Sequence, residues 1–202
     1  MQVHSRLAIV GDSHASRFAN EWQEALPQSV TGVQVEFIGR RGASLNGSTF
    51  CNTYIHAICE FRPTHIFLWV GNNDLEQNLR GFELKNGCSL PKEYQYGKFN
   101  QIYDNLVHLN DVIRERTGVN PTLFHSLSRF KCRNLMRPID YNKESMKFNM
   151  RIKGARWAFL RTFHMPANFY SIESYQDDKV HLQPHCYSYL VLSVYERYFL
   201  HN

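Results

Sequence analysis

Residues 7–13 of this 202-residue chain read Leu-Ala-Ile-Val-Gly-Asp-Ser, and this stretch decides the fold. Four consecutive apolar residues that end at a glycine are typical of a central strand in a parallel sheet, because such a strand is buried on both faces. A helical pattern follows from about residue 15 to residue 26, and Pro27 ends it. The stretch therefore predicts a strand and then a helix, with Ser13 at the turn between them.

The alternation of strands and helices continues to the end of the chain. Further strands are predicted at residues 33–38, 65–70, 121–127 and 168–172, and further helices at residues 49–61, 99–117, 141–163 and 185–199. Alternating strands and helices favour a parallel sheet that is covered by helices on both faces. The sequence therefore predicts an α/β fold with a mostly five-stranded parallel sheet. No repeat or linker divides the chain, so residues 1–202 are predicted to form a single domain.

Composition places the chain among ordinary globular proteins. Hydrophobic residues make up 43% and charged residues 20%, and the length is sufficient to bury a core without disulfides or metal ions. The five cysteines are odd in number and show no CxxC spacing, which favours reduced thiols over a disulfide framework or a zinc site.

Neither a membrane span nor a secretion signal is visible in the sequence. No apolar run approaches the roughly 18 residues that a membrane-spanning helix needs. The N-terminus lacks the pattern of a signal peptide. We therefore expect an intracellular, cytoplasmic location, unless the sequence has been trimmed.

One segment carries most of the positive charge. Residues 129–161 hold ten basic residues and two acidic ones, whereas the net charge of the whole chain is +5. A basic patch of this kind can bind phosphates, bind nucleic acid weakly, or contact an anionic membrane surface. The alternative is a solvated helix face whose charges are balanced by acidic residues elsewhere. The sequence leaves both interpretations open.

Ser13 is the candidate nucleophile. It lies between a strand and a helix, where Gly11 lets the backbone turn sharply. At the N-terminus of a helix the backbone N–H is unpaired, and the helix dipole stabilises developing negative charge. Serine is also a common N-cap residue, so the position alone does not separate a nucleophile from a capping residue.

His181 is the candidate base, because the hydroxyl of a serine needs a neighbour that takes its proton. Asp178 lies three residues earlier, so on a turn its carboxylate can reach the imidazole, hold its tautomer and stabilise the imidazolium. Three other histidines are rivals, namely His14, His164 and His185. His14 directly follows the serine and should point elsewhere, and His185 has a leucine rather than an acid three residues before it.

Asn73 and Gly42 complete a candidate oxyanion hole. Asn73 stands in the run Gly-Asn-Asn-Asp at residues 71–74, directly after the most apolar predicted strand. Its side-chain amide and the backbone N–H groups of Ser13 and Gly42 would each stabilise an oxyanion by roughly 3 kcal/mol. These groups are expected to lie together, because the carboxyl ends of parallel strands meet at one edge of a sheet. The alternative for residues 71–74 is a strand-ending turn, in which Asp74 would cap the next segment.

This ordered set of residues resembles the sequence blocks of the SGNH (GDSL-type) hydrolase superfamily, over nearly the whole chain. Residues 11–13, Gly-Asp-Ser, are similar to its first block, Gly42 to its second, residues 71–74 to its GxND third block, and residues 178–181, Asp-Lys-Val-His, to its DxxH fifth block. The resemblance implies a flavodoxin-like three-layer α/β/α sandwich. It also implies an esterase, lipase or carbohydrate-deacetylase activity that needs no cofactor and no metal.

The implied reaction is the hydrolysis of a carboxylic ester by a catalytic triad of Ser13, His181 and Asp178. The implied partner is a small-molecule or lipid ester with a short acyl, acetyl or longer acyl group. Two alternatives stay open. One is a non-catalytic SGNH-fold module that binds an anionic ligand, and the other is an O-acyltransferase that hands the acyl group to an alcohol. Relatives of the second kind usually lack the GxND block that this chain has.

Two regions depart from the family pattern. Residues 40 and 41 are both arginine, which makes the second block unusually basic, and Gly39 and Gly47 are alternatives to Gly42 for its glycine. The segment 75–97 shows no clear period and is long for a plain connection. Because it directly follows the third block, we expect it to overhang the pocket.

Overall fold

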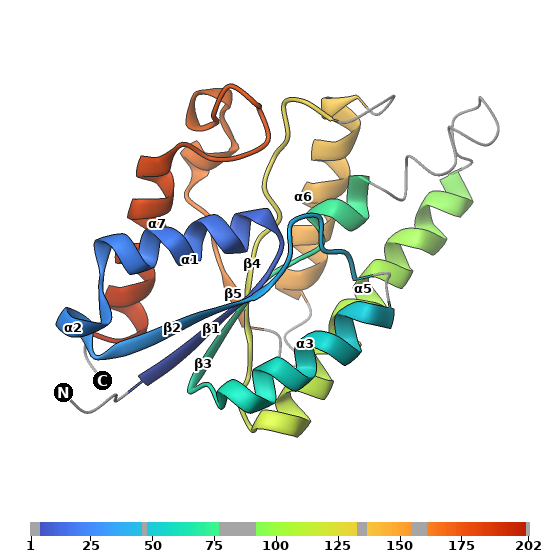
Figure 1. Cartoon of the computed structure of the whole chain (residues 1–202). Coiled ribbons are helices and arrows are strands. Elements are labelled where there is room, and N and C mark those ends of the chain that lie inside the picture. The colour runs from blue at the N-terminus through green and yellow to red at the C-terminus, as the bar shows by residue number, and fades with distance from the viewer. Residues whose placement is uncertain (1–4, 46–47, 77–91, 133–136, 155–160, 201–202) are drawn as a thin grey trace.

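The computed structural model describes residues 5–45, 48–76, 92–132, 137–154 and 161–200. Its centre is a sheet with the strand order β2-β1-β3-β4-β5 (Figure 1). The strands are β1 (Ser5–Gly11), β2 (Val33–Gly39), β3 (His65–Trp69), β4 (Thr122–Phe124) and β5 (Arg161–Phe163). Every neighbouring pair in this sheet runs parallel. The predicted α/β class with a five-stranded parallel sheet is therefore confirmed.

Helices cover both faces of the sheet and make it the middle of three layers (Figure 1). On one face lie α1 (Ser13–Ala25) and α7 (Pro184–Tyr198), and on the other lie α3 (Ser48–Phe61), α5 (Lys92–Thr117) and α6 (Pro138–Gly154). The short helix α2 (Gln28–Thr31) joins α1 to β2. This is the three-layer α/β/α sandwich that the family resemblance implied.

β1 is buried on both faces, which explains its uninterrupted apolar run. Leu7 and Ile9 belong to the core that contains α1 and α7, whereas Ala8 and Val10 belong to the core that contains α3, α5 and α6. All four side chains are 0% exposed. Burying each of the larger ones contributes roughly 2 kcal/mol. This packing fixes β1 in the interior of the sheet, between β2 and β3, and Ser13 lies just beyond its carboxyl end.

The turn from β1 into α1 depends on a glycine. A Cβ atom at Gly11 would lie 2.1 Å from the carbonyl oxygen of Trp69, the last residue of β3. The backbone N–H of Asp12 donates to the same oxygen at 3.3 Å. A side chain at position 11 would therefore force β1 and β3 apart, at the point where both strands lead into residues of the candidate site.

The prediction of a strand at residues 168–172 is wrong. The fifth strand is β5, and residues 168–172 belong to two 3₁₀ helices, Ala167–Tyr170 and Ile172–Ser174, and to Ser171 between them. Pro166 explains the difference, because it has no N–H for a sheet ladder and its ψ of 144° leads directly into the first of these helices. Phe169 is nevertheless buried, so the apolar pattern of this segment reflects core packing rather than a strand.

Two further elements are shorter than predicted at their ends. The helix predicted to reach residue 163 is α6, which ends at Gly154, and the strand predicted at 121–127 is β4, which ends at Phe124. Beyond β4, side chains take the place of the ladder. Asn149 accepts the backbone N–H of Ser126 at 2.8 Å, and Asn72 accepts that of Leu127 at 3.2 Å.

The segment between β3 and the next predicted helix is only partly described. Residues 77–91 lie outside the described residues, and residues 92–97 belong to α5, which begins before the predicted residue 99. The position of this segment over the pocket therefore stays a prediction, as does the single domain at residues 1–202. Within the described ranges, no helix is both long enough and apolar enough to cross a membrane.

Gly11→Ala should destabilise the fold strongly, because the new Cβ would overlap a backbone oxygen that cannot move without displacing β3. We expect the free energy of unfolding to fall by about 3 kcal/mol. Gly118→Ala is the matched control, since Gly118 also has a positive φ of 71°, but a Cβ there would meet no atom within 4 Å. The control should cost only about 1 kcal/mol, the strain of a left-handed alanine. Urea denaturation measures both values, and equal losses would contradict the close approach of β1 and β3.

Candidate active site

Asp12, not Ser13, caps helix α1. The Oδ1 atom of Asp12 accepts the backbone N–H of His14 at 2.9 Å, which is the contact that an N-cap residue makes. Ser13 is the half-buried first residue of α1, and its Oγ lies 2.8 Å from Nε2 of His181. The hydroxyl of Ser13 is therefore directed to the candidate base and not to the helix end.

A tight turn before α7 presents His181 to Ser13. Asp178 builds this turn, because its Oδ1 accepts the backbone N–H groups of Val180 and His181, both at 2.9 Å. Its Oδ2 lies 2.5 Å from Nδ1 of His181. Lys179 has a φ of +57°, which lets the chain reverse within the turn. Asp178 thus fixes both the backbone and the ring of His181, and the three predicted residues form a continuous chain of polar contacts.

The protonation states fit this geometry. Burial alone would raise the pKa of Asp178, but hydrogen bonds from the His181 ring and from two backbone N–H groups outweigh it and bring the pKa to about 2. Burial lowers the pKa of His181 below its ordinary value, and the hydrogen bond to Asp178 opposes this effect only in part. At neutral pH, Asp178 is therefore an ionised acceptor, so Nδ1 of His181 carries a proton and Nε2 can accept the proton of Ser13.

The rival histidines take other positions. His14 packs beside His181, with ring centroids 5.1 Å apart, and its Nδ1 lies 2.9 Å from the hydroxyl of Tyr187. Burial lowers the pKa of His14 well below its ordinary value, so this ring stays neutral and packs as part of the core. His164 and His185 are exposed. Of the four histidines that the sequence offered, His181 is the one that the structure places in hydrogen-bond contact with Ser13.

Asn73 lies shortly after β3, beside the turn into α1. Its Nδ2 donates to the carbonyl of Ala43 at 3.1 Å and to Oδ2 of Asp12 at 3.4 Å. The amide donor is therefore held between the residue that precedes Ser13 and the residue that follows Gly42. The segments after β1, β2 and β3 meet here, as the sequence predicted from the parallel sheet.

Gly42 lies in a turn that is attached to the end of β1. In this turn the backbone N–H of Ala43 donates to the carbonyl of Arg40 at 3.1 Å, and the N–H of Arg40 donates to the carbonyl of Gly11 at 3.2 Å. The φ of Gly42 is +74°, and a Cβ there would meet no atom within 4 Å. Backbone conformation rather than space therefore favours glycine at this position. The part of Gly42 as an oxyanion donor stays a prediction.

Arg129 is a site residue that the sequence analysis missed. It begins the basic segment 129–161 but is only 5% exposed. Its guanidinium forms an ion pair with Glu76, and its Nη2 donates to Oδ1 of Asn73 at 3.0 Å. Its position just after the fourth predicted strand could have indicated a place near the site, because the carboxyl ends of the strands form the edge of the sheet where the site lies.

Other basic residues of segment 129–161 make local contacts. Arg137 pairs with Asp140, and Lys147 on α6 pairs with Glu144 one turn before it. Both pairs lie at the surface, where such contacts contribute at most about 1 kcal/mol. They favour the interpretation of a solvated helix face for this part of the segment. Binding of nucleic acid or of an anionic membrane through residues 129–161 stays a prediction.

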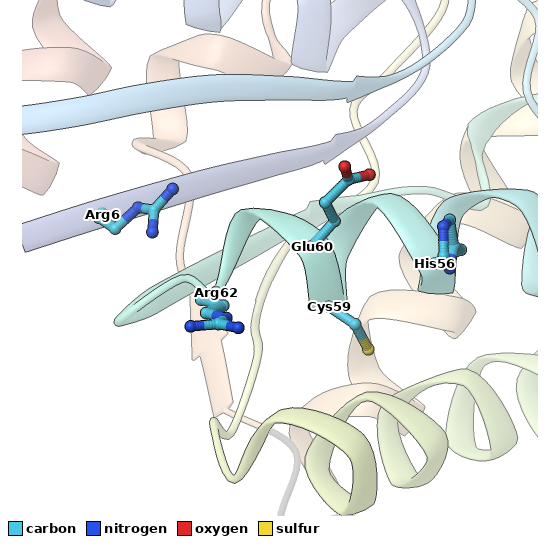
Figure 2. Close-up of a pocket in the computed structure, with 5 residues that line it drawn as sticks. All are labelled: Arg6, His56, Cys59, Glu60 and Arg62. Atoms are coloured by element: carbon cyan, nitrogen blue, oxygen red, sulfur yellow. The ribbon is translucent and has the colours of Figure 1, made fainter.

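A separate hollow of about 550 Å³ opens at the opposite end of β1. Figure 2 shows its lining, which consists of Arg6 on β1 and of four residues at the end of α3 and just beyond it, namely His56, Cys59, Glu60 and Arg62. Arg6 is near the amino end of β1, whereas Ser13 follows its carboxyl end. The hollow is therefore distinct from the candidate active site.

Neither a metal-binding cluster nor a disulfide is found among the side chains that the structure describes. No group of three or more His, Cys, Asp or Glu side chains that could hold a metal ion occurs there. Cys59, Cys132 and Cys186 are free thiols.

Two solved hydrolase structures match this arrangement of strands and helices over almost all of the chain. A GDSL-like lipase from Bacteroides thetaiotaomicron has a TM-score of 0.67 at 13% sequence identity, and the match covers 96% of this chain and 87% of that one. An acetyl xylan esterase has a TM-score of 0.65 at 12% identity, over 96% and 99% of the two chains. The chain has the fold of the SGNH (GDSL-type) hydrolases.

A third structure with a similar fold is an acetylxylan esterase from Geobacillus stearothermophilus, with a TM-score of 0.58 at 12% to 13% identity, over 97% of this chain and 94% of that one. Two of its structures are of catalytic mutants, one of an aspartate and one of the histidine three residues after it. No protein-family model and no curated protein matches the sequence. At these identities the likeness establishes the fold alone.

The pKa of His181 should lie below about 6.5, the ordinary value for a histidine, because burial disfavours the imidazolium. NMR titration of the His181 ring protons, assigned with His181→Gln, measures it. Asp178→Asn keeps an oxygen for the two backbone N–H groups but removes the charge, so it should lower the pKa of His181 further. A wild-type value above 6.5, or a rise in the variant, would contradict this electrostatic arrangement.

Proposed function

We propose that this protein is a serine esterase that hydrolyses carboxylic esters, with Ser13 as the nucleophile, His181 as the base and Asp178 as the acid that orients the base. One observation carries the proposal. The Oγ of Ser13 lies 2.8 Å from Nε2 of His181, and Nδ1 of the same ring lies 2.5 Å from Asp178. A serine becomes a strong nucleophile when a neighbouring base takes its proton and a third group orients that base.

In the first half of the proposed reaction, the Oγ of Ser13 attacks the carbonyl carbon of the ester while Nε2 of His181 takes the proton. His181 then gives this proton to the departing alcohol as the ester C–O bond breaks, and the acyl group stays on Ser13. In the second half, His181 takes a proton from water, the resulting hydroxide attacks the acyl group, and the proton returns to Ser13 as the carboxylic acid leaves.

The oxyanion that forms in both halves needs donors that are already in place. The backbone N–H of Ser13 supplies one, because it belongs to the first turn of α1 and has no partner within the helix. The proposed others are the backbone N–H of Gly42 and the Nδ2 of Asn73. Asn73 is held by contacts on both ends of its amide, which supports a preorganised donor.

The comparisons support the same roles and a class of substrate. In the acetylxylan esterase from Geobacillus stearothermophilus, the aspartate and histidine of the catalytic mutants have the spacing of Asp178 and His181. The neighbours described as a GDSL-like lipase and an acetyl xylan esterase favour a lipid or acetyl ester. We propose a small-molecule or lipid ester with an acetyl, short acyl or longer acyl group as the substrate.

The two alternatives differ from this proposal in distinct ways. A non-catalytic module would not need the contacts between Ser13, His181 and Asp178, so the intact chain of contacts argues against it. An O-acyltransferase would use the same residues but pass the acyl group to an alcohol instead of water. Hydrolysis and acyl transfer therefore differ in their products: hydrolysis releases a free carboxylic acid, and transfer forms a new ester.

A fluorophosphonate probe should form an adduct on Ser13, because only a serine with an adjacent base reacts readily with it. Mass spectrometry locates the adduct, and Ser13→Ala should abolish it. Ser126→Ala is the control, since Ser126 is 0% exposed and its hydroxyl donates to Asn72 at 2.6 Å, so this variant should still be labelled when folded. An adduct on another serine, or no adduct on the folded wild-type protein, would count against the proposal.

Turnover of an acetate ester should depend on the same residues to different degrees. Ser13→Ala should remove nearly all of it. The residual turnover of Asp178→Asn should be about 50-fold higher than that of Ser13→Ala, because a triad carboxylate contributes less than the nucleophile. Product analysis in the presence of an added alcohol then separates the two enzyme classes. Free carboxylic acid as the main product fits an esterase, and a new ester as the main product would identify an acyltransferase instead.

A further inference from the structure

Arg129 and Glu76 form a buried ion pair that contacts the candidate site without belonging to the triad. Each side chain is only 6% exposed. Removing two charges from water costs several kcal/mol per ion, so a buried pair contributes little net stability compared with apolar side chains of the same size. Net stability therefore does not account for this pair, whereas the contact between Arg129 and Asn73 links it to the candidate site.

One guanidinium holds two residues of the turn that follows β3. Nη2 of Arg129 donates to Oδ1 of Asn73 at 3.0 Å, and Nη1 pairs with Glu76. Asn73 and Glu76 are three residues apart in a helical turn, so their side chains lie on the same side of it. The planar fork of arginine can bind two acceptors in a fixed geometry, which the single ammonium group of lysine cannot do.

This contact selects one of the two orientations of the Asn73 amide. Because Arg129 holds the oxygen, Nδ2 is directed to the carbonyl of Ala43 at 3.1 Å and to Oδ2 of Asp12 at 3.4 Å. These two contacts engage both hydrogens of Nδ2, so an oxyanion beside Ser13 would take the place of the longer contact, the one to Asp12. If the amide turned over, an oxygen would face the position of the oxyanion and repel it.

The backbone around Arg129 is also tied to the base. The N–H of Phe130 donates to the carbonyl of Lys179 at 2.9 Å, inside the turn that presents His181. On the other side, Asn142 of α6 accepts the N–H of Arg129 at 2.8 Å and donates to its carbonyl at 3.1 Å. The backbone at Arg129 is thus held from two directions, which fixes the point from which its side chain extends.

We propose that Arg129 is a positioning residue: it holds the amide of Asn73 with its N–H donor toward the oxyanion, and Glu76 holds Arg129 in place. This role rests on the proposed esterase function, because an oxyanion forms only if Ser13 attacks a carbonyl. Arg129 is buried and, in this role, acts on the oxyanion through Asn73. Its removal should therefore affect the transition state and not the binding of the ester.

Arg129→Lys tests this role, because it keeps a positive charge beside Glu76 and loses the fork. We expect kcat for an acetate ester to fall by about 10- to 100-fold with little change in KM. Asn73→Ala alone should lower kcat by about 100- to 1000-fold, the usual effect of removing one oxyanion donor. In the Asn73→Ala background, Arg129→Lys should lower kcat by less than about 2-fold, because the group that it orients is gone.

A purely structural role would lower kcat by the same factor in both backgrounds, and that result would overturn the proposal. An unchanged kcat in Arg129→Lys would overturn it too. Arg137→Lys is the matched control, since Arg137 is an exposed arginine that pairs with Asp140, and kcat should not change. Thermal melting checks that each variant is folded.

Glu76→Gln serves as the second variant if Arg129→Lys does not fold. It keeps the shape and one oxygen acceptor of Glu76, so we expect a smaller loss of kcat that again disappears in the Asn73→Ala background. Equal losses in the two backgrounds would count against the role. If wild-type turnover does not depend on Ser13, the esterase proposal fails and the role of Arg129 fails with it. If turnover depends on Ser13 but the Arg129 variants behave as wild type, only the role of Arg129 fails.

Discussion

The close approach of Gly11 to the carbonyl of Trp69 is the constraint on which the candidate site depends. It brings the ends of β1 and β3 together with no room for a side chain between them. Ser13 and Asn73 follow these two strand ends directly, so their distance from each other is set by backbone contacts. The loop after β2 is then attached to the same edge, because the hydroxyl of Ser44 donates to Asp74 at 2.6 Å. Asp74 thus holds this loop, and Ser13 and Asn73 take positions that the sheet has already fixed.

A buried set of polar groups extends this order to the fourth strand. Oδ1 of Asn72 accepts hydrogen bonds from the hydroxyl of Ser126 at 2.6 Å, the N–H of Leu127 at 3.2 Å and the hydroxyl of Tyr141 at 3.3 Å. These groups would cost about 1–3 kcal/mol each if they were buried without partners, so the chain after β4 is strongly held in this path. Arg129 follows Leu127 by two residues and therefore reaches Asn73 from a fixed direction. Asn72 thus contacts the buried polar groups after β4, and its neighbour Asn73 contacts Arg129 in the candidate site.

The parts of the structure that could be predicted from the sequence are those with a local signal. The apolar run at residues 7–10, the glycine that ends it and the three-residue spacing of Asp178 and His181 can each be interpreted within a few residues, and these predictions agree with the structure. The fifth strand could not be placed, because an edge strand of three residues carries a weak pattern and Phe169 offers a stronger one. Arg129 looked like one more charge in a basic segment, since its partner Glu76 is far away in the sequence and only folding brings them together.

Two charged groups at opposite ends of one amide complete the electrostatics of the site. Burial raises the pKa of Asp12 to about 6, and the N–H of His14 and the charge of Arg129 limit this rise. Above that pH, Asp12 is an ionised acceptor at the Nδ2 end of Asn73, while Arg129 is a permanent donor at the Oδ1 end. The two charges favour the same orientation of the amide, and the charge of Arg129 also stabilises the ionised form of Asp12. The neutral form of His181 also increases with pH, because burial lowers the pKa of this residue. A rise in pH therefore favours both the orientation of the Asn73 amide described above and the neutral form of His181.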